Sequence, residues 1–372
     1  MSENIINLHK NVDTNPTPMF KILSINPGST STKFAVYEDE KILFLHTILH
    51  STEELKSFEK IIDQLDFRKN LILNSLKHDG VDLQTLSAIV GRGGLIRPVA
   101  SGVYLVNEKM IADLREAKKG EHASNLGGII AYEISRDIPE CKPFIVDPVV
   151  VDEMQDVARI SGLPQFPRRS MFHALNQKAV ARKYAASVSA GYENLNLVIA
   201  HLGGGISVSA HAKGKVIDTN QGLGGYGPFS PERSGTIDAG LLVDFCFQGQ
   251  ASKEEIKKML VGRGGLIAHL GTNDAYLAEQ KAVNGDTHAK LIMEAMAYNV
   301  AKEIGAMCTV LKGKVDAIIL TGGISRSEWF VNYVKEMVSS FGKLVVYPGE
   351  NEVEALAMGA LRVLRSESYK EY

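Results

Sequence analysis

The chain contains one structural unit twice, and this duplication constrains its fold more than any other feature of the sequence. Each copy has the pattern of a strand, a glycine-containing loop, a returning strand, a tight turn and a third strand. The copies cover residues 21–46 and 197–218, and Gly28 and Gly203 stand 175 residues apart. Because solenoid repeats have periods of roughly 20–50 residues, so long a period indicates a duplicated domain.

Segments with helical periodicity alternate with short apolar strands over the rest of the chain. Examples of the helical segments are residues 53–76, 125–136, 289–311 and 352–364. This mixture predicts an α/β protein. At about 100–200 residues per domain, the length of 372 residues and the apolar fraction of 45% predict two domains with substantial cores.

The composition limits the kinds of partner that the protein can bind and indicates its cellular compartment. The net charge of −2, with no basic block, argues against a nucleic-acid-binding surface. No apolar run approaches the roughly 20 residues that span a bilayer, so we expect no membrane contact. The three cysteines are scattered and form no CxxC or metal spacing, which favours small buried residues in a reducing cytoplasm: Cys141, Cys246 and Cys308.

Residues 1–18 are polar, contain two prolines and lack the apolar region of a signal peptide. We expect a mobile extension ahead of Met19. An upstream start codon or a cloning remnant would explain this segment equally well.

Three glycine-containing loops follow apolar strands and have the composition of anion-binding sites. The first, residues 26–33, carries four consecutive hydroxyl residues and ends in Lys33, which suits phosphate oxygens, although a plain hairpin turn uses similar residues. The second, residues 201–205, has three glycines that permit close approach of a ligand to the backbone. The third, residues 321–325, precedes a helix, where a nucleotide can rest; by itself, a βα loop without a ligand is the simpler interpretation.

One match to the dinucleotide-binding fingerprint does not have the structural context that such a site requires. Residues 222–227 match G-x-G-x-x-G but run into Pro228 and Pro231, so no helix opens there as a dinucleotide site requires. The sequence also lacks the P-loop, HExxH, GxSxG and protein-kinase signatures, so those enzyme classes lose their main support.

Several polar residues stand at strand ends or beside these loops, where the sites of open α/β folds lie. Arg92 and Arg233 could each hold a carboxylate or phosphate by two hydrogen bonds, although a lone arginine is more often a surface residue. Asp147 closes an apolar strand and could equally cap a turn. The other candidates are His122, His173 and His201, which are more often structural, and Glu350, Glu352 and Glu354, which a helix dipole would also favour.

Nine short motifs, taken together and in this order, resemble the acetate and butyrate kinase family. That family belongs to the superfamily of acetate and sugar kinases, Hsp70 and actin, and the resemblance spans nearly the whole chain from Met19. The motifs are INPGSTSTKF, GRGG, EHASN, VDPVV, MFHALNQ, AHLGGG, ERSG, LTGGIS and ENEVEAL. Within the family the chain is most similar to butyrate kinases, since acetate kinases are longer and carry NAGSSS in the first loop.

The resemblance implies a fold of two duplicated, actin-like and ribonuclease-H-like domains with the site in the cleft between them. It implies an N-terminal domain of residues 19–150 plus 354–372 and a C-terminal domain of residues 151–353 that binds nucleotide and dimerises. The implied reaction is reversible: butanoyl phosphate and ADP give butanoate and ATP, with Mg²⁺ as cofactor. The expected partners are these small molecules and further copies of the chain, as a homodimer or larger homo-oligomer.

The resemblance also implies roles for individual residues. Arg92 would bind the substrate carboxylate, and Arg233 and His173 would stabilise the transferring phosphoryl group. Asp147 would be catalytic and, with Glu352, would organise Mg²⁺, mostly through water. The other expected contacts are Asn26, Ser29, Ser31 and Lys33 for phosphate; His201, Gly203, Gly204, Gly205, Asp274, Gly322, Gly323 and Ile324 for the nucleotide; and His122 and Phe172 for the acyl substrate.

The sequence departs from acetate kinases at two further places. Gly204 stands where they carry asparagine, so backbone amides would have to make any phosphate contact there. Gly93 and Gly94 stand where they carry bulky aliphatic residues after the substrate arginine. We therefore expect room for a longer acyl tail, and each extra buried methylene would contribute about 0.8 kcal/mol toward a butyrate-like acid.

Two other functions stay open on the sequence. The chain could phosphorylate another short acid, such as isobutyrate, propionate or acetate. It could also be a nucleotide-dependent switch like actin or Hsp70. ATP turnover that requires an added C3–C5 carboxylate would distinguish a kinase from a switch.

Overall fold

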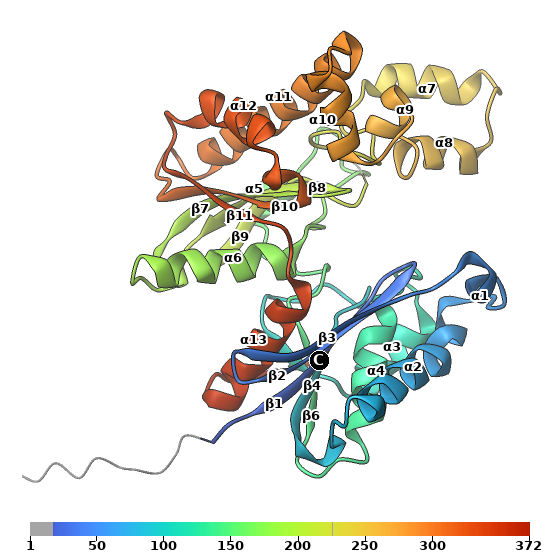
Figure 1. Ribbon diagram of the computed structural model, residues 1–372. Coiled ribbons are helices and arrows are strands. Elements are labelled where there is room, and N and C mark those ends of the chain that lie inside the picture. Colours follow the sequence, from blue (N-terminus) through green and yellow to red (C-terminus); the bar gives the residue numbers. More distant parts are fainter. Residues whose placement is uncertain (1–17, 225) are drawn as a thin grey trace, which may run out of the picture.

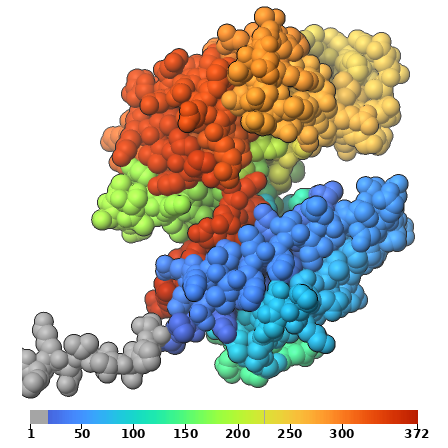
Figure 2. All heavy atoms as spheres, in the orientation of Figure 1, coloured from blue at the N-terminus to red at the C-terminus, as the bar shows by residue number. Residues whose placement is uncertain are grey.

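The computed structural model describes residues 18–224 and 226–372, so the predicted extension lies almost entirely outside the described residues. It forms two lobes, each built on one mixed β-sheet (Figure 1). The space-filling view shows the two lobes joined near the last helix, whose red spheres reach into the lower, blue lobe (Figure 2). The predicted α/β class with two duplicated, actin-like halves is confirmed.

The sheet of the N-terminal lobe has the strand order β12-β5-β6-β4-β1-β2-β3. Its strands are β1 (Lys21–Pro27), β2 (Ser31–Glu38), β3 (Lys41–Leu49), β4 (Leu86–Arg92), β5 (Val103–Leu105), β6 (Lys142–Val146) and β12 (Lys370–Glu371). The first three form the antiparallel meander that the sequence predicts, and β4 joins β1 in parallel on its other side.

The sheet of the C-terminal lobe repeats this topology with the order β11-β10-β7-β8-β9. Its strands are β7 (Asn196–Leu202), β8 (Ile206–Ala212), β9 (Lys215–Thr219), β10 (Ala317–Gly322) and β11 (Leu344–Pro348). Here β8 pairs antiparallel with β7 and β9 pairs antiparallel with β8, while β10 joins β7 in parallel. The pairing register also shifts at matching places, after Val36 in β2 and after Ala210 in β8, so the duplication extends to backbone detail.

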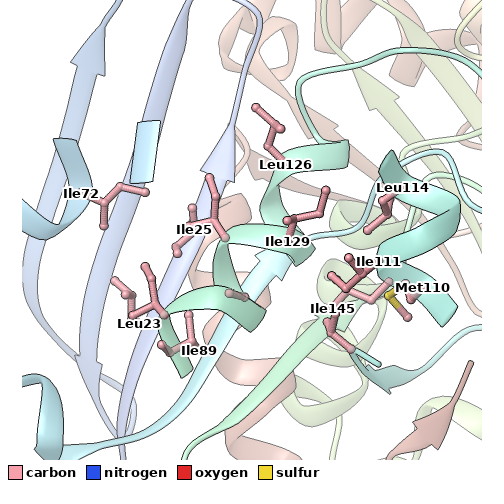
Figure 3. Close-up of a cluster of buried hydrophobic side chains, with 14 of the residues drawn as sticks. Leu23, Ile25, Ile72, Ile89, Met110, Ile111, Leu114, Leu126, Ile129 and Ile145 are labelled. Atoms are coloured by element: carbon pink, nitrogen blue, oxygen red, sulfur yellow. The ribbon is translucent and has the colours of Figure 1, made fainter. Parts of the chain in front are cut away.

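Helices cover both faces of the N-terminal sheet. One face packs against α2 (Leu65–His78), α3 (Glu108–Glu116) and α4 (Asn125–Ser135), through buried residues that include Ile25, Ile72 and Ile129 (Figure 3). The other face packs against α13 (Glu352–Arg365). Each fully buried aliphatic side chain of this kind stabilises the fold by roughly 1.5–3 kcal/mol. The helices packed on the two faces of the sheet therefore fix the positions of the ends of β4 and β6.

The C-terminal sheet is also enclosed on both faces. The long helix α11 (Thr287–Val310) and α12 (Glu328–Val338) pack on one face, and α6 (Ala174–Ser187) packs on the other. Helices α6 and α13 also contact each other, which joins the lobes. The remaining helices are α1 (Thr52–Lys56), α5 (Asp156–Arg159), α7 (Ala239–Phe247), α8 (Lys253–Leu260), α9 (Leu266–Leu270) and α10 (Ala275–Val283).

Two local predictions differ from the structure. The expected helix at residues 53–76 is broken after α1, because Asp63 caps the backbone N–H of Lys60 and starts a new 3-10 turn ahead of α2. The short strands β5 and β12 were not predicted, since runs of two or three residues carry no periodicity. Within the described residues, no helix has the length and apolar character needed to cross a membrane.

Candidate active site

The residues predicted to act on the substrates meet where the two lobes face each other. Strands β4 and β6 end there, and helices α6 and α13 begin there. All four elements line one small cavity, whose predicted site residues are Arg92, Gly93, Asp147, Phe172, His173 and Glu352. Its volume of about 10 Å³ holds roughly one water molecule, so an organic acid enters only when the lining residues move apart.

Arg92, at the end of β4, forms an ion pair with Glu352 in the first turn of α13. Asn26 ties the pair together, because its amide nitrogen donates to Glu352 Oε2 at 2.5 Å and its oxygen accepts from Arg92 Nη1 at 3.4 Å. The guanidinium side chain remains 25% exposed. A substrate carboxylate has the same charge and shape as that of Glu352, so it can replace Glu352 beside Arg92.

His173 and His201 form a stacked pair at the cavity, with ring centroids 3.9 Å apart. Burial, with the charges of His201, Arg233 and Arg92, holds the pKa of His173 well below its usual range. Burial also lowers the pKa of His201 to about 4, although Glu352 opposes the shift. Both imidazoles are therefore neutral near pH 7 and act as hydrogen-bonding groups rather than as cations.

Arg233 reaches the second glycine loop from an irregular segment of the C-terminal lobe. Its Nη1 donates to the carbonyl of Gly222. A Cβ placed on Gly205 would stand 1.2 Å from that nitrogen, so only glycine leaves space for the guanidinium. Nε of Arg233 is buried and has no hydrogen-bond partner among the described residues. A buried, unpaired donor is costly unless a ligand satisfies it, which suits an anion-binding role.

Asp147 lines the cavity, but its carboxylate is engaged by protein groups. Ser101 Oγ and the backbone N–H of Gly102 donate to Oδ1 at 2.6 and 2.8 Å, and Arg182 Nη1 lies 3.2 Å from Oδ2. Burial alone would raise the pKa of Asp147, but Arg182, Lys178 and these hydrogen bonds outweigh it and lower the pKa. The carboxylate is therefore ionised, fixed in orientation and 1% exposed.

The carboxylates at the cavity do not form a ready-made metal site. Among the described residues, no group of three or more His, Cys, Asp or Glu side chains could hold a metal ion. Asp147 and Glu352 already bind protein donors through both of their oxygens. Direct coordination by Asp147 does not fit this arrangement. A Mg²⁺ ion held by nucleotide phosphates and reached through water does fit, because Mg²⁺ usually keeps several waters.

The first predicted phosphate loop is the turn between β1 and β2, closed by a 2.8 Å bond from the Gly28 N–H to the Ser31 carbonyl. A fully buried arginine, Arg68 of α2, supports it from inside the lobe. Its guanidinium donates to the carbonyls of Gly28 and Ser31, both at 2.9 Å, and to Thr32 Oγ1 at 2.9 Å. Arg68 thus satisfies the carbonyl oxygens of the loop by hydrogen bonds, while Ser29 remains exposed and Lys33 half-buried.

A second cavity of about 640 Å³ opens beside the second glycine loop, a size typical of small-ligand sites. Its lining includes the predicted nucleotide residues Gly203, Gly204, Asp274, Gly323 and Ile324, together with Glu350. The Asp274 carboxylate also caps α10, accepting from the N–H groups of Tyr276 and Leu277. Gly322 packs against the Leu202 backbone, which a Cβ would strike at 2.4 Å, and does not line this cavity.

His122 lies near the cavity but not on its wall. Its Nδ1 lies 2.8 Å from Ser124 Oγ. Burial and the charge of Arg92 lower its pKa, against the opposing charge of Glu352, which indicates that the imidazole lies close enough to sense both partners of the ion pair.

The expectation that Gly93 and Gly94 leave open space for an acyl tail is wrong in this structure. A Cβ on Gly93 would stand 2.5 Å from Pro148 Cβ, and a Cβ on Gly94 would stand 2.4 Å from Asn125 Oδ1 and 2.8 Å from Leu114 Cδ2. The missing side chains are filled by neighbouring protein atoms. A valine at residue 94 would therefore strain the contact with α4 rather than shorten a substrate pocket.

Several residues that shape the site were not identified from the sequence. Arg68, Arg182 and Ser207 carry no local signal, because arginine and serine occur throughout solvated surfaces and turns. Asn176 and Gln177 follow His173 within the MFHALNQ motif, and this proximity was the only signal for them. Asn176 Oδ1 accepts from Nδ1 of His201 at 2.9 Å, so it orients that ring.

The two duplicated sheets, with arginines at the cleft and a cavity of about 640 Å³ beside it, define a two-lobed, actin-like fold. The sequence matches the profile of the acetokinase family over residues 164–359, slightly more than half of the chain. The chain belongs to the acetokinase family and is therefore a carboxylate kinase, of the kind that uses ATP and ADP.

Solved structures with the same fold cover more than nine-tenths of the chain. An acetate kinase from Porphyromonas gingivalis has a TM-score of 0.77 at 20% identity, covering 93% of this chain and 100% of its own. A propionate kinase from Francisella tularensis subsp. tularensis SCHU S4 has a TM-score of 0.72 at 21% identity, covering 92% and 99%. An acetate kinase from Entamoeba histolytica has a TM-score of 0.72 at 18% identity, covering 91% and 98%. At such identities the likeness establishes the fold alone.

Proposed function

We propose that the chain is a butyrate kinase, which reversibly transfers a phosphoryl group between ATP and butanoate. The observation that carries the proposal is the convergence of Arg92, His173 and Arg233 near one interlobe cavity beside a nucleotide-sized cavity. An attacking carboxylate and a nucleotide phosphate repel each other, so donors and positive groups must hold them in line. This site supplies them without a basic surface.

In the proposed reaction each residue acts through its observed chemistry. Arg92 exchanges Glu352 for the substrate carboxylate and holds it beside the phosphoryl group. Arg233 and neutral His173 donate hydrogen bonds to the equatorial oxygens, where charge is greatest in a loose transition state. Glu352, once released from Arg92, and Asp147 would hold hydrated Mg²⁺ through its water ligands. When bound, Mg²⁺ supplies neutralisation of phosphate charge.

The choice of butyrate rests on the resemblance of the motifs to butyrate kinases. Since Gly93 and Gly94 do not open a pocket, the other apolar residues that line the cavity are left to contact an acyl tail: Val146, Pro148, Val149, Phe172, Ala174 and Leu175. Propionate or acetate is the second candidate, because the structural neighbours include an acetate kinase and a propionate kinase. A panel of C2–C5 acids, compared by kcat/KM, tests the choice. ATP turnover without any carboxylate would instead favour a nucleotide-dependent switch.

Arg92→Ala tests the carboxylate-binding role. Because a paired guanidinium bound to a carboxylate is worth roughly 2–3 kcal/mol, we expect the KM for butyrate to rise about 30–150-fold and the KM for ATP to change little. Initial rates with each substrate varied in turn measure both constants. Arg136→Ala, at an exposed arginine of the same lobe, is the matched control. Equal increases in the two KM values would contradict the assignment.

We also propose that the chain forms a homodimer through the predicted C-terminal domain, residues 151–353. Helix α7 is largely apolar yet buries none of its residues. Leu241 and Phe247 of α7 are 71% and 88% exposed, and two apolar cavities of about 650 and 540 Å³ adjoin the helix. So large an exposed apolar patch is typical of an interface, and a second copy is the occupant that the family resemblance implies.

Leu241→Asp tests this interface. A buried, unpaired carboxylate on each side of a symmetric contact would weaken association strongly, so we expect a monomeric mass at micromolar concentration by light scattering. Leu49→Asp, at a 77% exposed leucine of the N-terminal lobe, should leave the dimer intact. A wild-type monomer, or an unchanged mass for Leu241→Asp, would refute the proposed interface.

A further inference from the structure

A continuous series of hydrogen bonds runs through the interior of the C-terminal lobe and ends at His173. Tyr192 Oη lies 2.7 Å from His211 Nδ1, and His211 Nε2 lies 3.0 Å from Gln177 Oε1. Gln177 Nε2 lies 2.9 Å from Ser207 Oγ, which lies 2.8 Å from His173 Nδ1. Gln177, Ser207 and His211 are fully buried, so each donor and acceptor must be satisfied within this series.

Gln177 fixes the direction of the series. Its Nε2 is 3.0 Å from the backbone carbonyl oxygen of Ser207, which can only accept a hydrogen bond. The amide nitrogen must therefore face Ser207, and Oε1 must face His211. His211 then donates through Nε2–H, and its Nδ1 accepts from the Tyr192 hydroxyl.

The hydrogen bonds of Ser207 determine that its hydroxyl donates to His173. Its Oγ receives two donors, Gln177 Nε2 at 2.9 Å and the backbone N–H of His173 at 3.3 Å. A hydroxyl has two lone pairs and one hydrogen, so both lone pairs are used and the hydrogen remains. The nearest acceptor for it is Nδ1 of His173, at 2.8 Å. Nδ1 thus accepts, and the single proton of the neutral ring resides on Nε2.

The tautomer matters because of what Nε2 faces. Within the described part of the chain no hydrogen bond engages His173 Nε2, and the residue lines the interlobe cavity. The ring is neutral, as its lowered pKa requires. Phosphoryl oxygens only accept hydrogen bonds. The Nε2–H tautomer therefore presents a donor to them, whereas the other tautomer would present a repelling lone pair.

We propose that Ser207 and Gln177 are positioning residues that hold His173 as the Nε2–H tautomer and so make it a permanent hydrogen-bond donor at the reaction centre. The catalytic consequence rests on the proposed function, but the tautomer itself is a property of the resting protein. His211 and Tyr192 complete the series by holding the Gln177 amide in its orientation. Neither Ser207 nor Gln177 needs to touch a substrate.

Nitrogen NMR of the ligand-free protein, with ¹⁵N-labelled histidine, tests the tautomer directly. His173→Gln identifies the His173 signals by their loss. We expect a protonated Nε2 and an unprotonated Nδ1 near pH 7. A protonated Nδ1, or an imidazolium, would overturn the proposal even if the enzyme proves to be the expected kinase. Conversely, the expected spectrum without kinase activity would count against the proposed function alone.

Variants then test the role of Ser207. For Ser207→Ala we expect the His173 signals to show a mixture of tautomers and kcat to fall about 10–100-fold, with the KM for ATP changed less than threefold. Ser209→Ala removes another buried hydroxyl of β8, bonded to Thr219 instead, and should change neither readout. Gln177→Met gives a second test at the next position in the series. A single Nε2–H tautomer with full kcat in both Ser207→Ala and Gln177→Met would refute the positioning role.

Discussion

Replacing Gly205 by alanine is expected to lower kcat by about two to three orders of magnitude, because the new methyl group would displace Arg233. Its Cβ would stand 1.2 Å from Nη1 of Arg233 and 2.7 Å from the Gly222 carbonyl to which that nitrogen donates. The guanidinium cannot remain where it is. An arginine that stabilises phosphoryl transfer contributes about 10³–10⁵ in kcat, so even partial displacement should be severe.

Steady-state kinetics of three variants separate this effect from damage to the loop. Gly204→Ala adds the same methyl group one residue earlier, where the nearest atoms belong to Glu232 at an ordinary 3.6 Å. Because Gly204 lines the nucleotide cavity, we expect a higher KM for ATP but a kcat at saturating ATP within a few-fold of the wild-type value. Arg233→Ala measures the largest decrease in kcat that removal of the guanidinium can cause. The double variant Gly205→Ala with Arg233→Ala should be no worse than Arg233→Ala, since the two changes remove one interaction. A folded Gly205→Ala enzyme with near-normal kcat would exclude this role for Arg233.

The sequence predicted the architecture well because the fold depends on patterns that repeat. The two copies of the meander, at residues 21–46 and 197–218, became two sheets that share a five-strand order, β6-β4-β1-β2-β3 in one and β11-β10-β7-β8-β9 in the other. Once each glycine loop lies at the end of its central strand, the topology brings Arg92 and His173 to the same cleft. Those residues follow strands or begin helices, and such positions can be recognised without knowing any tertiary contact.

Packing around the site could not be predicted, because it depends on partners far away in the chain. Gly93 and Gly94 suggested a roomy pocket, yet Pro148 and Asn125 occupy the space. Arg68 lies in a helix that could equally be solvated, and only the fold places it beneath the loop at residues 26–33. The residue type alone does not show whether a charged or hydroxyl side chain is buried or exposed.

Asp147→Asn is expected to reduce the free energy of unfolding by about 3 kcal/mol, because it leaves Arg182 without its buried counter-ion. Asparagine is the suitable replacement, since Asp147 has a φ of 38° and asparagine tolerates this left-handed region better than alanine. Urea unfolding measures the loss. The lowered pKa of Asp147 also gives a pH signature. The stabilisation by the ionised carboxylate is present above the unfolded pKa of about 3.9. It is lost as the pH falls through the lower native pKa. The free energy of unfolding of the variant should therefore depend less on pH in that range than that of the wild type.

The double variant Asp147→Asn with Arg182→Met distinguishes a structural carboxylate from one that also serves the reaction. Removing both charges leaves no uncompensated guanidinium, so at least half of the lost stability should return. We expect kcat to stay orders of magnitude below the wild-type value, because the double variant lacks the ionised carboxylate at the cavity even where its stability is restored. Recovery of kcat together with stability would show that Asp147 acts only by neutralising Arg182. Failure of both to recover would mean that Arg182 has a role beyond pairing with Asp147, such as holding its neighbour Tyr192, over whose ring it lies at 5.9 Å.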